Sequence, residues 1–141
     1  MQLSLSLSAA VADALSSASL PATVAILPMH AFHPEELARP ALCVMVSEVV
    51  RKAGIMATGK IILEYRTDPD SEPPATSATN LETAASYILS DTGRDALQTL
   101  LTDLSIRLRV LSPAGESAVI EEGRHLVFSV AMTFWVQTSL P

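Results

Sequence analysis

Two histidines and two glutamates lie close together in the segment "HAFHPEE", and these residue types bind metal ions. A spacing of three residues on a loop, as between His30 and His33, can bring two imidazoles to one ion. Pro34 follows at once, however, and neither a cysteine nor a third histidine lies nearby. Since two ligands rarely hold a metal, we interpret the segment as a solvated loop and expect no metal site.

Asp68, Asp70 and Glu72 resemble a fragment of a calcium-binding loop. The glycine and the distal glutamate of such a loop are missing, and three prolines intrude. We instead predict an exposed loop over residues 68–79. We expect it to contact a neighbouring subunit or the lumen of an assembly, where its acids would keep DNA from adhering.

The other residue types that perform chemistry do not form a recognisable site. Arg107 and Arg109 share one side of an alternating segment and could hold an anion, although salt bridges to carboxylates are the commoner outcome. Cys43 is the single cysteine and lies in an apolar run, so we predict a buried, unreactive thiol. There is no glycine-rich phosphate loop and no nucleophile elbow around a serine. We expect no catalytic residue and no cofactor.

Composition favours a protein that associates with other chains. The 141 residues carry a formal net charge of −6, which argues against binding nucleic acid by neutralising phosphates. Hydrophobic residues make up 49% and charged residues 17%, against about 25% charged in an average soluble domain. Such a chain should cover apolar surface with partners, unless its many alanines merely inflate the count.

The N-terminal segment superficially suggests a signal peptide. It has no positively charged start, and Asp13 interrupts its apolar part, so we reject that interpretation. No apolar run reaches 18 residues, so we expect no transmembrane helix and place the protein in a cytoplasm or in a particle assembled there.

The elements predict a single α+β domain over residues 1–141. Leucines and valines at i, i+4 spacing favour a helix over residues 3–18, despite a serine–leucine alternation. Residues 28–40 and 68–79 are predicted loops, and Thr79 with Glu82 fits a capping box that begins a mid-chain helix, which Gly93 should interrupt. Strand patterns occupy the remainder, with a turn at 112–117. We expect a mostly antiparallel sheet of about four to six strands, flanked by the N-terminal helix and one or two mid-chain helices.

The last strand pattern, "HLVFSVAMTFWVQT", raises a question about its second face. One parity is plainly apolar, whereas the other carries small neutral groups and the single tryptophan: Val127, Ser129, Ala131, Thr133 and Trp135. A solvent face would normally carry lysine and glutamate. Either a helix of the same chain covers this face, or another subunit does.

The arrangement resembles the tail-completion or tail-terminator family of long-tailed bacteriophages. The resemblance spans most of the chain and is carried by the segments "PATVAIL", "RPALCVMVSEVV", "GKIILEYRT", "NLETAASYIL" and "EEGRHLVFSVAMTFWVQ". It implies a structural virion protein that forms a homo-oligomeric ring, commonly a hexamer, at the end of the tail tube. Its implied partners are the tail tube protein and the neck or connector proteins, and DNA would pass through the ring.

Other functions stay open beside this one. The serine- and alanine-rich first helix departs from the family pattern, so another neck or head–tail adaptor component is one alternative. A non-viral oligomeric interaction domain, or a domain that binds a small hydrophobic molecule between sheet and helices, is a second. A small hydrolase is a third.

Overall fold

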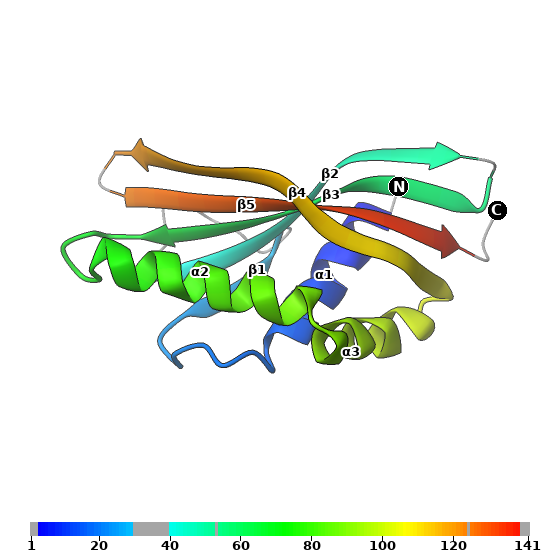
Figure 1. The fold of residues 1–141 in the computed structure, drawn as a ribbon, viewed down its shortest axis with the longest axis horizontal. Helices are drawn as coiled ribbons and strands as arrows, with labels where there is room; N and C mark the ends of the chain where they lie inside the picture. Colours follow the sequence, from blue (N-terminus) through cyan, green and yellow to red (C-terminus); the bar gives the residue numbers. More distant parts are fainter. Residues whose placement is uncertain (1–2, 30–39, 53, 124, 139–141) are drawn as a thin grey trace.

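The computed structural model describes residues 3–29, 40–52, 54–123 and 125–138. Three helices pack on one face of a single twisted sheet, which makes the fold α+β as predicted (Figure 1). The elements in chain order are α1 (Leu3–Leu15), β1 (Ala25–Pro28), β2 (Ala41–Lys52), β3 (Met56–Thr67), α2 (Pro74–Leu89), α3 (Asp91–Thr102), β4 (Ile106–Glu122) and β5 (His125–Thr138).

The N-terminal segment is helical because its leucine and valine stripe finds a core. Leu3, Leu7, Val11 and Leu15 are all buried in one cluster with the inner side of the sheet. Burial of an apolar stripe outweighs the serine–leucine alternation, which would have suited a strand. The helix ends at Leu15, three residues before the predicted end at 18, and single turns continue the chain to Ala18.

The sheet is mixed, with the strand order β1-β2-β3-β5-β4. β1 runs parallel to β2, and the other neighbours are antiparallel, so the expectation of a mostly antiparallel sheet is confirmed. In the middle of the sheet Gly59 lies opposite Phe134, and a Cβ on Gly59 would stand 2.8 Å from the phenyl ring. Glycine is needed here because the ring packs directly on the backbone.

The helical region begins and breaks elsewhere than predicted. α2 starts at Pro74, with proline in the first turn, rather than at Thr79, and the loop before it is only 68–73. Thr79 lies inside the helix and donates its hydroxyl hydrogen bond to the Ala75 carbonyl, so the capping box does not form. The break between α2 and α3 falls at Ser90, whose hydroxyl caps α3 by accepting from the Gly93 amide at 3.1 Å.

The turn predicted at 112–117 is also wrong. β4 continues through it as one strand of 17 residues, paired to β5 on both sides. Irregularities between Leu108 and Val110, and between Pro113 and Ser117, absorb the extra residues. Serine, proline and glycine therefore mark bulges in a long strand here, not its end.

The core lies between the helices and the inner face of the sheet. It includes Tyr65, Leu97, Leu101, Met132 and Phe134 among its members. Cys43 is buried as predicted, and burial raises the pKa of its thiol to about 12. No helix in the described part of the chain is long and apolar enough to span a membrane.

Candidate interaction surface

The second face of β5 belongs to the side of the sheet on which none of the described helices packs. We call this side the outer face; on β5 it carries the five residues Val127, Ser129, Ala131, Thr133 and Trp135. The core cluster takes only the opposite parity of β5, and in Figure 1 the three helices lie together beneath the sheet. None of the three described helices packs on this face of β5, although Val127 and Ala131 are themselves buried, at 2% and 7% exposed.

The middle of the outer face is hollow because its side chains are short. A hollow of about 560 Å³ is lined by Ser129 and Ala131 of β5, by Ile62 of β3 and by residues of the β4 bulge. At its border Lys60 pairs with Glu48 across 3.3 Å. This is the one predicted set of small neutral residues that the structure brings together, and it leaves room for another surface to approach closely.

Trp135 stands toward one end of the outer face among exposed apolar neighbours. The sheet register places Val110 of β4 on one side of it and Thr58 of β3 on the other, and Val50 of β2 lies beyond Thr58. Val110 is 41% exposed and Val50 is 51% exposed. The indole Nε1 is buried and has no hydrogen-bond partner among the described residues, so apolar surface is what this half-buried ring presents outward. We call Val50, Val110 and Trp135 the Trp135 patch.

A second apolar spot lies at the opposite end of β4. Val119 and Ile120 are 60% and 51% exposed, although both are paired in the ladder with β5. Glu121 follows them and is exposed. We call these three residues the β4 tip; it lies at the same end of the molecule as the loop between β3 and α2 (Figure 1).

The acidic loop is divided between an exposed part and an anchored part. Asp70 is exposed, and its amide binds the Asp68 carboxylate at 2.9 Å within the loop. Glu72 instead turns inward, where it accepts hydrogen bonds from the Tyr65 hydroxyl at 3.0 Å and the Ser77 hydroxyl at 2.6 Å. Of the three predicted loop acids, Glu72 therefore holds the loop to the domain, and Asp70 is the one at the exposed turn.

A basic end lies opposite the acidic loop. Arg51 and Lys52 end β2, while Arg107 and Arg109 begin β4, and all four side chains are exposed. The irregularity after Leu108 breaks the alternation, so Val110 joins the outer face instead of lying opposite both arginines, as the sequence suggested. The expected salt bridges to Arg107 and Arg109 do not form among the described residues.

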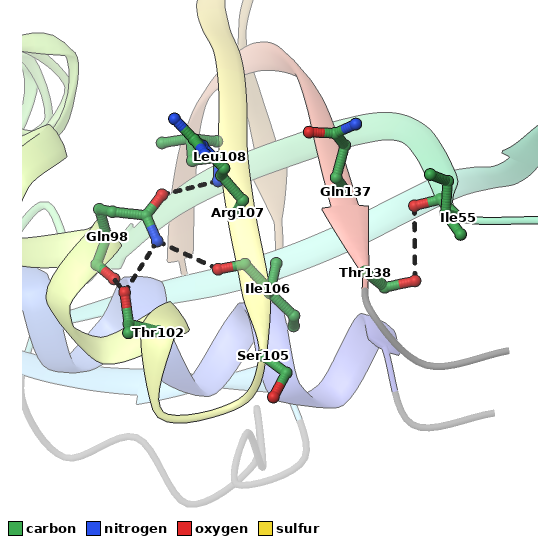
Figure 2. Close-up of a pocket in the computed structure, with 9 residues that line it drawn as sticks. All are labelled: Ile55, Gln98, Thr102, Ser105, Ile106, Arg107, Leu108, Gln137 and Thr138. Carbon is green, nitrogen blue, oxygen red and sulfur yellow. Dashed lines mark hydrogen bonds between the residues drawn. The ribbon is translucent and has the colours of Figure 1, made fainter.

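A hollow of about 840 Å³ with a mixed polar and apolar lining opens beside this basic end (Figure 2). The side-chain amide of Gln98 in α3 makes two hydrogen bonds to the start of β4. It donates to the Ile106 carbonyl at 3.1 Å and accepts from the Leu108 amide at 2.7 Å. Thr138 donates its amide to the Ile55 carbonyl at 2.7 Å on the other side. These groups are satisfied within the fold, which leaves the Arg107 guanidinium as the charged group available to a partner.

At the end of the sheet that carries the acidic loop, most charged side chains form ion pairs within the chain. Arg66 donates to Glu122 at 2.7 Å and lies 3.6 Å from Glu64. The hydrogen bond from Arg66 lowers the pKa of Glu122. Asp70 and Glu121 have no such ion pair with described residues and remain for outside contacts.

The described residues do not include a group of three histidine, cysteine or acidic side chains placed to hold a metal ion, and His30 and His33 lie outside them. No protein-family model matches the chain, and no curated protein matches its sequence.

The sequence analysis did not predict that Val110, Val119 and Ile120 are exposed, because only the bulges and the free end of β4 expose them.

Proposed function

We propose that the protein is a structural subunit of a homo-oligomeric ring that ends the tail tube of a long-tailed bacteriophage and joins it to the neck. The observation that carries the proposal is the outer face: a side of the sheet on which none of the described helices packs, and to which β5 contributes small neutral residues and Trp135. Short neutral side chains permit close contact, and tryptophan is favoured at the centre of interfaces.

Two further features support this proposal. The order of helices and strands agrees with the segments on which the resemblance to the tail-terminator family rests. The net charge of −6 suits a ring through which DNA passes without adhering, since like charges repel.

The test is the substitution Trp135→Ala in the full chain. We expect a folded subunit that no longer assembles, because the half-buried ring supplies contact area to a neighbour; truncation at such an anchor costs about 2 kcal/mol or more of association free energy. Sedimentation measures the assembly, and thermal melting measures the fold. Leu5→Ala, on the exposed side of α1, is a control for the stability lost when exposed apolar surface is trimmed.

Two outcomes would count against the proposal. An unfolded Trp135→Ala chain would mean that the indole ring stabilises the core of its own subunit. A folded variant that assembles like the wild type would show that Trp135 is not an anchor. A wild type that stays monomeric at high concentration would overturn the proposed oligomeric ring.

A groove between α2 and the β4–β5 pair favours a second candidate function, binding of a small hydrophobic molecule. Leu81, Ala85 and Leu89 line it on the helix, with Val119 and Phe128 opposite, and its volume is about 460 Å³. A monomer that retains an apolar fluorescent dye, and loses it on Ala85→Trp, would support this function in place of the ring.

A further inference from the structure

The two ends of the sheet differ in charge, and each combines its charge with exposed apolar side chains. At one end the Trp135 patch adjoins Lys52 and Arg107. At the other, Val119 and Ile120 adjoin Glu121. Each end thus presents the features of an interface, an apolar centre with charged residues beside it.

The charges of the two ends are complementary. Among the described residues the basic end holds four exposed cations and the acid Asp103 in the turn before β4, while Glu48, which lies beside Trp135, is paired with Lys60. The opposite end holds the exposed acids Asp70 and Glu121, while its described cation, Arg66, is already paired with Glu122. Arg124, between β4 and β5 in the sequence, lies outside the described residues.

We propose that the β4 tip of one copy, together with Asp70, docks on the Trp135 patch and the basic end of a second copy. This inference rests on the proposed ring and names the surfaces by which its subunits meet. A contact between two different surfaces of identical chains is heterologous, and repeating it closes a ring when the rotation between copies permits.

The ion pairs and the apolar contacts have different roles because they contribute different amounts of free energy. An exposed ion pair contributes about 0.2–1 kcal/mol, so Arg107 and Lys52 cannot hold the subunits together alone. Ile120, which shares the outer face with Val127, would supply the burial against Trp135, while the charges select which end meets which and speed the encounter.

A second copy fits the basic end better than DNA does. A phosphate backbone would pair with the cations but would leave the apolar surface of the exposed valines and the half-buried tryptophan without a partner. The net negative charge of the chain also repels the phosphates. A second copy uses both the charges and the apolar surface, and it carries the matching acids at its other end.

The test uses two charge-reversed full chains. One carries Asp70→Lys with Glu121→Lys, and the other carries Arg107→Glu with Arg109→Glu. We expect each variant alone to need at least a tenfold higher concentration than wild type to assemble, because like charges then face each other. Mixed in equal amounts they should assemble near the wild-type concentration, since every contact again joins opposite charges. Analytical ultracentrifugation reads all three samples.

The controls separate charge from folding. Asp13→Lys with Asp95→Lys makes the same charge change on exposed positions of the helices and should assemble like wild type. Should a reversed chain fail to fold by circular dichroism, the neutral pair Arg107→Gln with Arg109→Gln takes its place and should assemble more weakly than wild type.

The outcomes distinguish this inference from the proposed function. A wild type that assembles, with reversed chains that assemble equally well or a mixture that fails, overturns the end-to-end contact and leaves the ring standing. A monomeric wild type overturns both. Retention of wild type on duplex DNA that is lost in the Arg107→Glu, Arg109→Glu chain, with assembly unchanged, would also overturn the inference and assign the basic end to phosphate.

Discussion

Tyr65 links the core to the loop that precedes α2. Its side chain is fully buried, yet its hydroxyl receives a hydrogen bond from Asn80 and donates one to Glu72, each at 3.0 Å. Glu72 is further held by Ser77. This short network fixes both the start of α2 and the base of the loop that presents Asp70, so one buried phenol positions an exposed acid.

Tyr65→Phe should lower the free energy of unfolding by about 1–3 kcal/mol, because the buried Asn80 amide and Glu72 lose a partner. Urea denaturation measures the difference. Tyr87→Phe is the matched control: it removes a hydroxyl that makes no hydrogen bond to the described residues, and it should cost much less. Equal losses in the two variants would contradict the network.

The same residue predicts an alkaline limit to stability. Burial raises the pKa of Tyr65 from 10.0 to about 12, and burial raises that of Cys43 from 9.0 to about 12. Both groups stay protonated in the folded chain after they ionise in the unfolded chain. Their stabilising contribution is therefore complete below pH 9 and is lost as the pH rises toward 12.

Denaturation at a series of pH values should show stability falling across this range in the wild type. The fall should be shallower in Tyr65→Phe above pH 10, and in Cys43→Ala above pH 9. A wild type whose stability stays flat up to pH 12 would contradict the burial of both ionisable groups.

At the scale of elements, the junction of α2 and α3 depends on a glycine. A Cβ on Gly93 would clash with the Tyr87 carbonyl oxygen, which the chain cannot accommodate without moving a helix. We expect Gly93→Ala to cost about 2–4 kcal/mol of stability, as a steric clash with backbone does. Thermal melting measures the cost.

Gly115→Ala provides the comparison for that substitution. Gly115 has a φ of +74°, and a Cβ there would meet nothing within 4 Å, so only the backbone preference is lost. That preference costs about 1–2 kcal/mol. A Gly93→Ala chain as stable as Gly115→Ala would mean that the two helices can separate at little expense.

The sequence predicted the elements whose periodicity is decided locally. The stripe from Leu3 to Leu15 and the alternation along β5 were sufficient for α1 and for the last strand, since each has one plainly apolar side. The α2 start and the continuity of β4 could not be predicted in the same way. Pro74 begins a helix and Pro113 lies within a strand because of tertiary pairing and packing, which the local pattern does not contain.

The candidate surface was predictable only in part. The neutral character of Ser129, Ala131 and Thr133 is visible in the sequence, whereas the packing of all three described helices on the other side of the sheet is not. The exposed position of Val110 depends on a bulge, and bulges leave no reliable local signal.

At the scale of the whole molecule, the separation of charge along the sheet makes association sensitive to salt. The screening length falls from about 10 Å at 0.1 M to about 3 Å at 1 M. We expect the concentration needed for assembly to rise several-fold over that range. The Arg107→Gln, Arg109→Gln chain should lose most of this dependence; a dependence equal to that of wild type would place the responsible charges elsewhere.

The irregularities in the hydrogen-bond ladder of β4 should disfavour the growth of fibrils from this edge of the sheet. A straight outer strand of 17 residues would offer a long row of free amides and carbonyls, the template on which fibrils grow. Pro113 has no amide hydrogen to offer, and the two irregularities bend the strand on either side of it. The free edge is thereby divided into short, mutually twisted pieces, so we expect less strand-by-strand aggregation than a straight edge strand of this length would give.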